Sequence, residues 1–505
     1  MSMLKPACVL FMEVPDTDFA DFLGKADEFI DRYPEILDAI EADLDARGRE
    51  KKKLRLEEQR WERWQCAEPL SGLEPDWEEI EPEELQLRQG RPRMPAAVVF
   101  MFMMVRAYAD GAGSRDFQDL TQESMTVELL LRNHDMDMPG VSTINENLNA
   151  VSNETRRLIQ RRQARYARAE GLDDFAEMTT DSSSVAANTA WPTDSAIILK
   201  LLRRVWNTGS RLEEYGTENF RRHWTEWWLE EMQSENFAIV MSDGRRERKK
   251  HYRRFLKFAE NAAEHLEGQR QALEERIEPR RIHPRPRRRL NRDRFQLRRD
   301  LEDVRKMIEV ARRRIFDGEQ TPADERVLSV ADEDAAFITK GDRDPVVGYR
   351  PQICRSANGF VGYLEVPEGN AADSERFLPA LEGWKETTGV VPDLVSTDDG
   401  YTSAAGKREA QRMGVETVSF SGSKGRRLLG HWDWWDEERM RARQERSAVE
   451  SLIFTLKYCY GFGRASRRGI EAVRAELLEN AIAHNFFQMV RLQRRKEADK
   501  IPTAA

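Results

Sequence analysis

The chain has 505 residues, too many for one ordinary hydrophobic core, and this length predicts about two to four packed units. Hydrophobic residues make up 40% and charged residues 34%, which excludes wholesale disorder and leaves long charged helical surfaces. The net charge of −9 at pH 7 argues on average against a nucleic-acid partner, but Arg and Lys are concentrated in residues 245–254 and 280–294, so the partner has to be inferred locally.

Two features of the sequence indicate the compartment. The cysteines are far apart in the chain and predict neither a disulfide framework nor a zinc site: Cys8, Cys66, Cys354 and Cys459. The apolar run at residues 96–105 is too short to span a bilayer, and the start of the chain lacks a basic region leading into an apolar signal segment. We therefore expect a protein of the reducing cytoplasm, without export and without a membrane partner.

The N-terminal part of the chain is predicted to be helical in two regions. Residues 1–90 form an acidic accessory region with proline breaks, and residues 91–170 form a compact helical domain. In that domain an apolar helix is expected at residues 95–108, and Thr143 with Glu146 forms a capping-box pair that predicts the start of a further helix. Such helices fit a DNA-binding helix-turn-helix and an ordinary three-helix domain equally well.

Beyond Trp206 the sequence is charged and helical, and two stretches carry apolar residues at spacings of three and four, the pattern of a packed helical seam. The first seam is interrupted by Arg270 and comprises Leu256, Ala259, Ala263, Leu266, Leu273 and Ile277. The second seam is unbroken and comprises Leu297, Leu301, Val304, Ile308, Ala311 and Ile315. The Arg- and Pro-rich segment from Pro279 to Arg294 cannot be helical throughout, so we expect an antiparallel helical hairpin with a basic tip.

Near Ala336 the hydrophobic pattern changes from helical to alternating. The expected elements are strands at residues 347–354 and 360–366, a helix at 374–384, a strand at 393–397, a helix after Tyr401 and a strand at 415–420. Asn358-Gly359 is a preferred two-residue hairpin turn between the first two strands, and Pro351 favours an edge or irregular position in the first of them. This order of elements predicts a mixed α/β sheet.

Two aspartates stand at the ends of expected strands. Asp181 follows the strand expected at residues 175–180, and Asp398 closes the strand at 393–397 just before Gly400. Carboxylates at strand ends face the crevice in which α/β sheets bind ligands. Taken alone, each aspartate is better explained as an ordinary turn or cap residue.

A third carboxylate, Glu450, lies in a helix expected at residues 437–458. The spacing Arg446-x3-Glu450-x6-Lys457 places all three side chains on one helical face, because offsets of four and eleven are close to whole turns. The alternative is a solvated salt-bridge stripe. Apolar residues make the helix amphipathic and indicate that its charged face borders the core: Val449, Leu452, Ile453 and Leu456.

Carboxylates from separate segments are the ligands that two Mg²⁺ ions prefer, with Mn²⁺ as a possible substitute. In phosphoryl transfer one ion lowers the pKa of an attacking water or DNA 3′-hydroxyl, and the other, about 4 Å away, stabilises the leaving oxygen. Arg446 or Lys457 would then anchor a DNA phosphate.

Short motifs around these carboxylates resemble those of bacterial insertion-sequence DDE transposases, most closely the ISNCY-like group. The motifs around the aspartates are Thr179-Thr180-Asp181-Ser182-Ser183-Ser184-Val185, Trp191-Pro192-Thr193-Asp194-Ser195 and Ser396-Thr397-Asp398-Asp399-Gly400-Tyr401-Thr402-Ser403. The spacing around Glu450 is similar to the Glu-centred signature of related DDE families. With a similar intervening segment from Ile315 to Asn370 and a similar closing helix at residues 481–487, the resemblance extends from about Arg91 to Leu492.

The resemblance implies that Asp181, Asp398 and Glu450 are the first, second and third metal ligands of a ribonuclease H-like catalytic core. It favours Asp398 over Asp399, which the residues alone leave tied. One departure concerns the position three residues before the signature Arg, where related families often have Tyr and this chain has Arg443. That departure puts an assisting Tyr in doubt and leaves the three carboxylates unaffected.

The resemblance also implies a domain order. The discontinuous catalytic core comprises residues 171–200 and 316–490, with a helical insertion at 201–315. The all-α, helix-turn-helix-like DNA-binding region lies at 91–170, and 491–505 form a charged tail. The basic tip of the insertion is expected either to contact transposon-end DNA or to be a solvated loop, and its candidate DNA-binding residues are Arg280, Arg281, Arg285, Arg287, Arg288 and Arg289.

The function expected from the sequence is therefore that of a DDE transposase associated with the nucleoid. It would bind terminal inverted repeats, cleave the 3′ ends with metal-activated water and join them to target DNA, as a homodimer that bridges two ends. Two alternatives stay open: a ribonuclease H-like nuclease without strand transfer, and a domesticated, non-catalytic DNA-binding protein.

Overall fold

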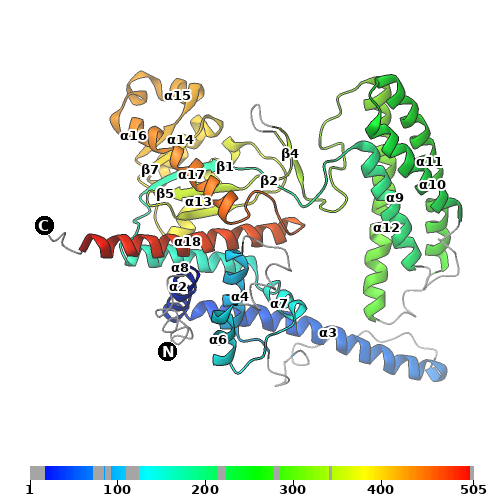
Figure 1. The fold of residues 1–505 in the computed structure, drawn as a ribbon, viewed down its shortest axis with the longest axis horizontal. Coiled ribbons are helices and arrows are strands. Elements are labelled where there is room, and N and C mark those ends of the chain that lie inside the picture. The colour runs from blue at the N-terminus through cyan, green and yellow to red at the C-terminus, as the bar shows by residue number, and fades with distance from the viewer. Residues whose placement is uncertain are drawn as a thin grey trace. The chain divides into compact units, whose positions relative to one another are not determined.

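The computed structural model of the chain describes residues 18–71, 85, 93–109, 124–212, 223–276, 284–339 and 344–500. The chain folds into two compact units, which we call the core unit and the helical unit (Figure 1). The core unit comprises Met1–Arg47, Gln89–Asn188 and Asp334–Ala505, and the helical unit comprises Gly48–Arg88 and Thr189–Glu333. None of the described helices is both long and apolar enough to cross a membrane.

A five-stranded mixed sheet lies in the core unit. Its strands, in spatial order, are β6 (Val361–Glu365), β5 (Gln352–Ser356), β1 (Glu177–Ser182), β7 (Leu394–Thr397) and β8 (Thr417–Phe420). β1 pairs antiparallel with β5 and parallel with β7, and β7 pairs parallel with β8. All residues of β7 and β8 are buried, as expected for strands whose two faces are covered. The mixed sheet confirms the predicted α/β class and is compatible with a ribonuclease H-like fold.

Helices that follow the strands in sequence pack against this sheet. They are α13 (Asp373–Thr388), α14 (Ala404–Met413), α15 (Gly422–Trp434), α16 (Glu437–Glu445), α17 (Ser447–Cys459) and α18 (Ile470–Lys500). α13 contacts β5 and β6, α16 contacts β7 and β8, and α17 contacts β1 and β5. The predicted order of strand, helix and strand from residue 360 to 420 is confirmed.

β5 and β6 form the hairpin predicted at Asn358-Gly359. Gly359 has a φ of +89°, a conformation that glycine adopts without steric strain, and its N–H donates to the carbonyl of Ser356 at 3.0 Å. The single strand predicted at residues 347–354 is wrong. β4 (Val346–Tyr349) belongs to a separate sheet with β2 (Val185–Ala186) and β3 (Ala336–Ile338), and β5 begins only at Gln352. Pro351 lies in the break because it has no N–H to donate to a ladder.

Of the two helices predicted in the N-terminal part of the chain, one is observed where it was expected and the other begins elsewhere. The described helices are α2 (Asp18–Arg32), α3 (Glu35–Ser71), α4 (Ala96–Tyr108), α6 (Met125–Asn133), α7 (Val141–Leu148) and α8 (Asn153–Ala169). α4 matches the predicted apolar helix and is almost wholly buried. The helix start predicted at Thr143 is wrong, because α7 follows Gly140 and α8 follows Ser152, whose hydroxyl accepts the N–H of Thr155 at 3.1 Å. α4 and α8 contact α18, and this packing does not establish a helix-turn-helix.

A buried cluster of charges joins these N-terminal helices to α18. The carboxylate of Glu479 on α18 accepts hydrogen bonds from Arg106 of α4 at 2.7 Å, from Arg156 of α8 at 2.6 Å and from Arg467 at 2.5 Å. The side chain of Glu479 is 1% exposed. Burial alone would raise its pKa, but the three guanidinium groups outweigh this and hold the pKa of Glu479 far below its ordinary value. The cluster therefore ties three chain segments together through one carboxylate.

Acidification is expected to destabilise the core unit through His484. The imidazole is buried on α18 with Nε2 3.0 Å from the carbonyl oxygen of Gly359, and burial lowers the pKa of His484 to about 4. An unfolded His titrates at about pH 6.5, so the unfolded chain takes up the proton first and this contribution to stability is lost as the pH falls from about 6.5 toward 4. Urea unfolding across this pH range should show a steeper loss for the wild type than for His484→Gln. Equal pH dependence of the two proteins would contradict this prediction.

The helical unit contains α9 (Asp194–Leu212), α10 (His223–Met241), α11 (Arg245–Arg276) and α12 (Pro284–Arg312), followed by a π-helical turn at Arg313–Asp317 (Figure 1). The described parts of both predicted seams are buried in one core, except Ile315, which is only partly buried. The side chain of Leu273 and the whole of Ile277 lie outside the described residues. Arg270, which interrupts the first seam, pairs with Glu267 and Glu274 on its own helix.

The basic segment between the two seams is more helical than the sequence indicates. α12 begins at Pro284, so the described part of the segment from Pro279 to Arg294 is helical. Pro284 and Pro286 lie in the first turn, where a missing N–H leaves no intrahelical hydrogen bond unmade.

Candidate active site

Asp181 and Asp398 lie at corresponding positions on neighbouring parallel strands. Thr180 of β1 is in register with Thr397 of β7, and each aspartate is the next residue in its segment. Adjacent strands are about 4.8 Å apart, so the two carboxylates start from adjacent backbone positions at the same end of the strands. Asp181 lies inside β1 and not after it, because pairing with β5 extends β1 to Ser182.

Asp398 and Asp399 are distinguished by their hydrogen bonds. Asp399 accepts the backbone N–H groups of Gly425 at 2.8 Å and Lys424 at 3.2 Å, at the start of α15. Burial opposes ionisation of Asp399, but these N–H groups outweigh it and lower the pKa of Asp399. Asp398 accepts the N–H of Gly400 at 2.9 Å, the residue that follows in the same turn. Asp399 thus fixes the start of a helix, whereas the carboxylate of Asp398 bonds within its own turn.

Glu450 is linked to Asp181 through Arg446. The Arg446 guanidinium lies 2.8 Å from Oε1 of Glu450 and 3.8 Å from Oδ2 of Asp181. The helix predicted at residues 437–458 is interrupted at this arginine, where α16 ends and α17 begins. The Ser447 hydroxyl donates to the carbonyl of Gln444 at 3.2 Å, a local bond that competes with the helical pattern. Arg446 therefore lies at a junction and contacts carboxylates from two separate elements.

The remaining residues of the predicted signature lie on the same pair of helices. Of the four apolar residues predicted to pack, Val449, Leu452 and Leu456 are buried and Ile453 is partly buried, while the side chain of Glu450 is 57% exposed. Lys457 lies farther along α17 than Glu450. Arg443, which takes the place of the Tyr of related families, stacks on the ring of Trp434 at 4.0 Å.

Two charged residues near the aspartates were not selected from the sequence. Arg350 donates to Oδ2 of Asp373 at 2.5 Å and to the hydroxyl of Ser182, beside Asp181, at 3.3 Å. Asp373 Oδ2 and Asp398 Oδ1 lie 2.9 and 3.1 Å from the point that a Cβ would occupy on Gly400. A carboxylate near the start of a predicted helix looks like a cap, so only its hydrogen bond with Arg350 and its position beside Gly400 reveal Asp373.

Tyr401 lies in the interior between these groups. It is fully buried and its hydroxyl donates to Oε1 of Gln352 on β5. Burial, followed by the charges of Asp373 and Asp181, raises the pKa of Tyr401 well above its ordinary value. The phenol is therefore neutral, and its hydrogen bond joins the turn after β7 to β5.

The donor set suits hard divalent cations, which bind carboxylate oxygens. In the part of the chain that the structure describes, no three His, Cys, Asp or Glu side chains lie close enough together to hold a metal ion. Glu450 is the member directed elsewhere, since Arg446 binds it. The structure thus places Asp181 and Asp398 at neighbouring positions and pairs Glu450 with Arg446.

The predicted DNA-binding arginines of the insertion belong to the helical unit, whereas the three carboxylates belong to the core unit. Arg285 pairs with Glu58 at 2.8 Å, and Arg288 pairs with Glu57 at 2.8 Å. Arg289 lies 3.8 Å from Asp293 on its own helix. Burial lowers the pKa of Arg287. Arg280 and Arg281 lie outside the described residues.

Part of the chain that carries these residues is similar to a known protein family. Residues 311–486 match the family model described as "Transposase DDE domain". The matched segment contains β5 to β8, Asp398 and Glu450, and it begins after β1, so it does not include Asp181. No curated protein and no solved structure matches the chain. Residues 311–486 are therefore similar to the DDE domain of transposases, and this similarity supports a transposase.

Proposed function

We propose that this protein, as an ISNCY-like DDE transposase, binds the terminal inverted repeats of its element, cleaves their 3′ ends and joins them to target DNA. The observation that carries the proposal is the placement of Asp181 on β1 beside Asp398, the residue that follows β7, with Arg446 between Asp181 and Glu450. A carboxylate set drawn from two strands and a helix supports two-metal phosphoryl transfer.

The three carboxylates would hold two Mg²⁺ ions, or Mn²⁺ in their place, through oxygen donors. When bound, the ions lower the pKa of an attacking water or 3′-hydroxyl and stabilise the leaving oxygen. Arg446 balances the charges of Asp181 and Glu450 beforehand, and its guanidinium then becomes available to a DNA phosphate. Arg350 holds Ser182 and Asp373 in place beside the aspartates.

DNA binding is proposed for further parts of the chain. The short helices at residues 91–170 supply the elements that a helix-turn-helix needs, and a homodimer would bring two transposon ends together. Lys457 would contact DNA near Glu450. The core of residues 171–200 and 316–490, interrupted by the insertion at 201–315, remains the proposed catalytic domain.

The proposal is tested with purified protein, labelled DNA that carries the element's end, and a supercoiled target plasmid. With Mg²⁺ we expect a nick at the 3′ end of the element and covalently joined products. EDTA should abolish both products. The absence of any metal-dependent cut at the element end would contradict the proposed function.

The two alternatives give different results in the same assay. Cutting without joined products would identify a nuclease, since the same metal geometry serves hydrolysis alone. Specific binding to the element end without any cut would identify a domesticated DNA-binding protein. The presence of all three acidic residues weighs against the domesticated protein, and the family match of residues 311–486 favours a transposase over a simple nuclease.

A further inference from the structure

The helical unit has two basic segments, and the structure places them in different surroundings. At the start of α12, Arg285 and Arg288 are each bonded to a glutamate of α3 at 2.8 Å. Their charges are therefore partly neutralised within the unit. The other basic segment is the start of α11, from Arg245 to Lys257, which we call the α11 basic segment.

The composition of the α11 basic segment is unfavourable for the helix itself. Its thirteen residues include eight Arg or Lys and a single acidic residue, Glu247. The N-terminus of a helix carries a partial positive charge, so acidic residues stabilise the first turn and cations destabilise it. Arg245, Arg246 and Arg248 all lie in or next to that first turn and are exposed. Such an arrangement is relieved by an anion, which both the helix end and the side chains attract.

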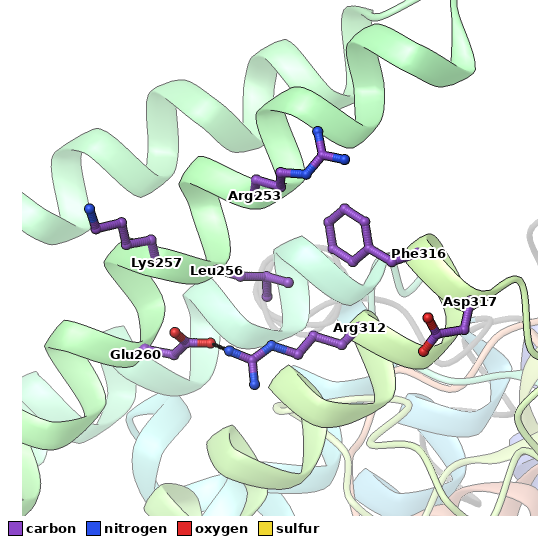
Figure 2. A pocket seen from close by; sticks show the side chains of 7 residues that line it. All are labelled: Arg253, Leu256, Lys257, Glu260, Arg312, Phe316 and Asp317. Atoms are coloured by element: carbon purple, nitrogen blue, oxygen red, sulfur yellow. Dashed lines mark hydrogen bonds and ion pairs between the residues drawn. The ribbon is translucent and has the colours of Figure 1, made fainter.

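One side of the α11 basic segment borders an open cavity of about 360 Å³ (Figure 2). The cavity is lined by Arg253, Leu256, Lys257 and Glu260 of α11, by Arg312 at the end of α12, and by Phe316 and Asp317 of the π-helical turn. π-helical turns are rare and frequently occur at functional sites. The turn is followed by Gly318 with a φ of +76°, which ends the helix abruptly beside the cavity.

Cations gather around the aromatic ring in this cavity. The guanidinium carbon of Arg253 lies 5.4 Å and the ammonium of Lys249 lies 5.8 Å from the centre of the Phe316 ring. Lys249 also donates to the carbonyl of Phe316 at 3.1 Å. Figure 2 shows Arg253 and Phe316 on one side of the cavity, and Arg312 bound to Glu260 on the other.

The charges that line the cavity leave an excess of cations. Arg312 neutralises Glu260, which leaves Asp317 against Arg253, Lys257 and the adjacent Lys249. Within the described residues, neither Arg253 nor Lys257 has a carboxylate in an ion pair, and both side chains are exposed. Arg253 and Lys257 are one helical turn apart and share a face of α11.

We propose that the α11 basic segment and its cavity bind the phosphate backbone of duplex DNA. The DNA-binding face of the helical unit is then the start of α11 and not the paired start of α12. This inference rests on the proposed function, because it specifies where a DNA-processing enzyme holds its substrate. Phosphate oxygens would contact Arg253 and Lys257, and release of their counterions would make binding strongly salt-dependent.

The test compares two double variants of the full chain that each remove two positive charges. One is Arg253→Gln with Lys257→Gln, and the control is Arg285→Gln with Arg288→Gln. Binding to a labelled duplex of mixed sequence is measured by fluorescence anisotropy over a range of NaCl concentrations. For the first variant we expect affinity to fall roughly tenfold and the log–log salt slope to become shallower by nearly two units, about 0.9 per lost contact. For the control we expect an affinity within about twofold of wild type.

Thermal melting of both variants checks that they remain folded. A third double variant, Arg253→Lys with Lys257→Arg, keeps both positive charges and should bind DNA as the wild type does. The inference is overturned if the α11 variant binds with the wild-type salt slope, or if the α12 variant loses as much affinity. Failure of the wild type to bind duplex DNA at all would instead contradict the proposed function. The wild-type measurement alone therefore distinguishes failure of the proposed function from failure of the inference about α11.

Discussion

Asp398→Asn is expected to abolish DNA cleavage while Asp399→Asn retains it. Asn keeps the size of the side chain but removes the charge that a divalent cation requires, a loss of several kcal/mol in the transition state and on the order of 1000-fold in rate. At position 399 the two carboxylate oxygens accept the backbone N–H groups of Lys424 and Gly425, one each. The single amide oxygen of Asn can keep one of these hydrogen bonds, and no metal ligand is lost. The rate of Asp399→Asn should therefore stay within about tenfold of wild type.

Two further measurements separate lost chemistry from lost structure. The affinity of Asp398→Asn for element-end DNA should equal that of wild type, because phosphate binding depends on cations elsewhere. Its melting temperature should be unchanged or higher, because a negative charge beside Asp181 has been removed. Equal cleavage by the two variants, or a greater loss in Asp399→Asn, would show that Asp398 is not the ligand.

Glu479→Gln is expected to lower the stability of the core unit by roughly 3–5 kcal/mol, because it leaves three buried guanidinium groups without their common anion. Urea unfolding at neutral pH measures the loss. Glu471→Gln is the matched control on the same helix: its side chain is 70% exposed and pairs with Arg474, so we expect a change below about 0.5 kcal/mol. A similar small change in both variants would mean that the buried cluster contributes little.

The same cluster gives stability a defined dependence on acid. Because the folded pKa of Glu479 is depressed, its contribution is present above the unfolded value of about 4.5 and is lost as the pH falls below it. This loss comes at lower pH than that of His484, whose window ends at about 4. In a plot of the free energy of unfolding against pH, Glu479→Gln should therefore reduce the slope only in the most acidic range.

Local patterns predicted most of the elements and few of the breaks between them. The hairpin turn at Asn358-Gly359, the strand before Asp398 and the seams of α11 and α12 follow from turn chemistry and hydrophobic spacing. The helix start assigned to Thr143 is wrong because α7 already begins at Val141 after Gly140, and a separate helix, α8, begins after the cap Ser152. The break between β4 and β5 requires knowledge that two sheets meet there, which a run of apolar residues does not reveal.

The candidate site was only partly accessible from the sequence. Strand ends indicated Asp181 and Asp398, but the preference for Asp398 over Asp399 came from resemblance. The hydrogen bonds of Asp399 now give that preference a physical reason. Arg350 and Asp373 were missed because their relation to Asp398 depends on segments brought together by the sheet. The bridging position of Arg446 likewise depends on α17 packing against β1.

The central claim is that Asp181, Asp398 and Glu450 together bind divalent metal. The most direct test is a crystal of the protein with its element-end DNA and Mn²⁺, measured for anomalous scattering. We predict a manganese peak coordinated at roughly 2 Å by carboxylate oxygens of both Asp181 and Asp398, with Glu450 turned from Arg446 toward the metal site. A peak bound by Asp399 in place of Asp398, or no manganese shared by Asp181 and Asp398 with DNA in place, would contradict it.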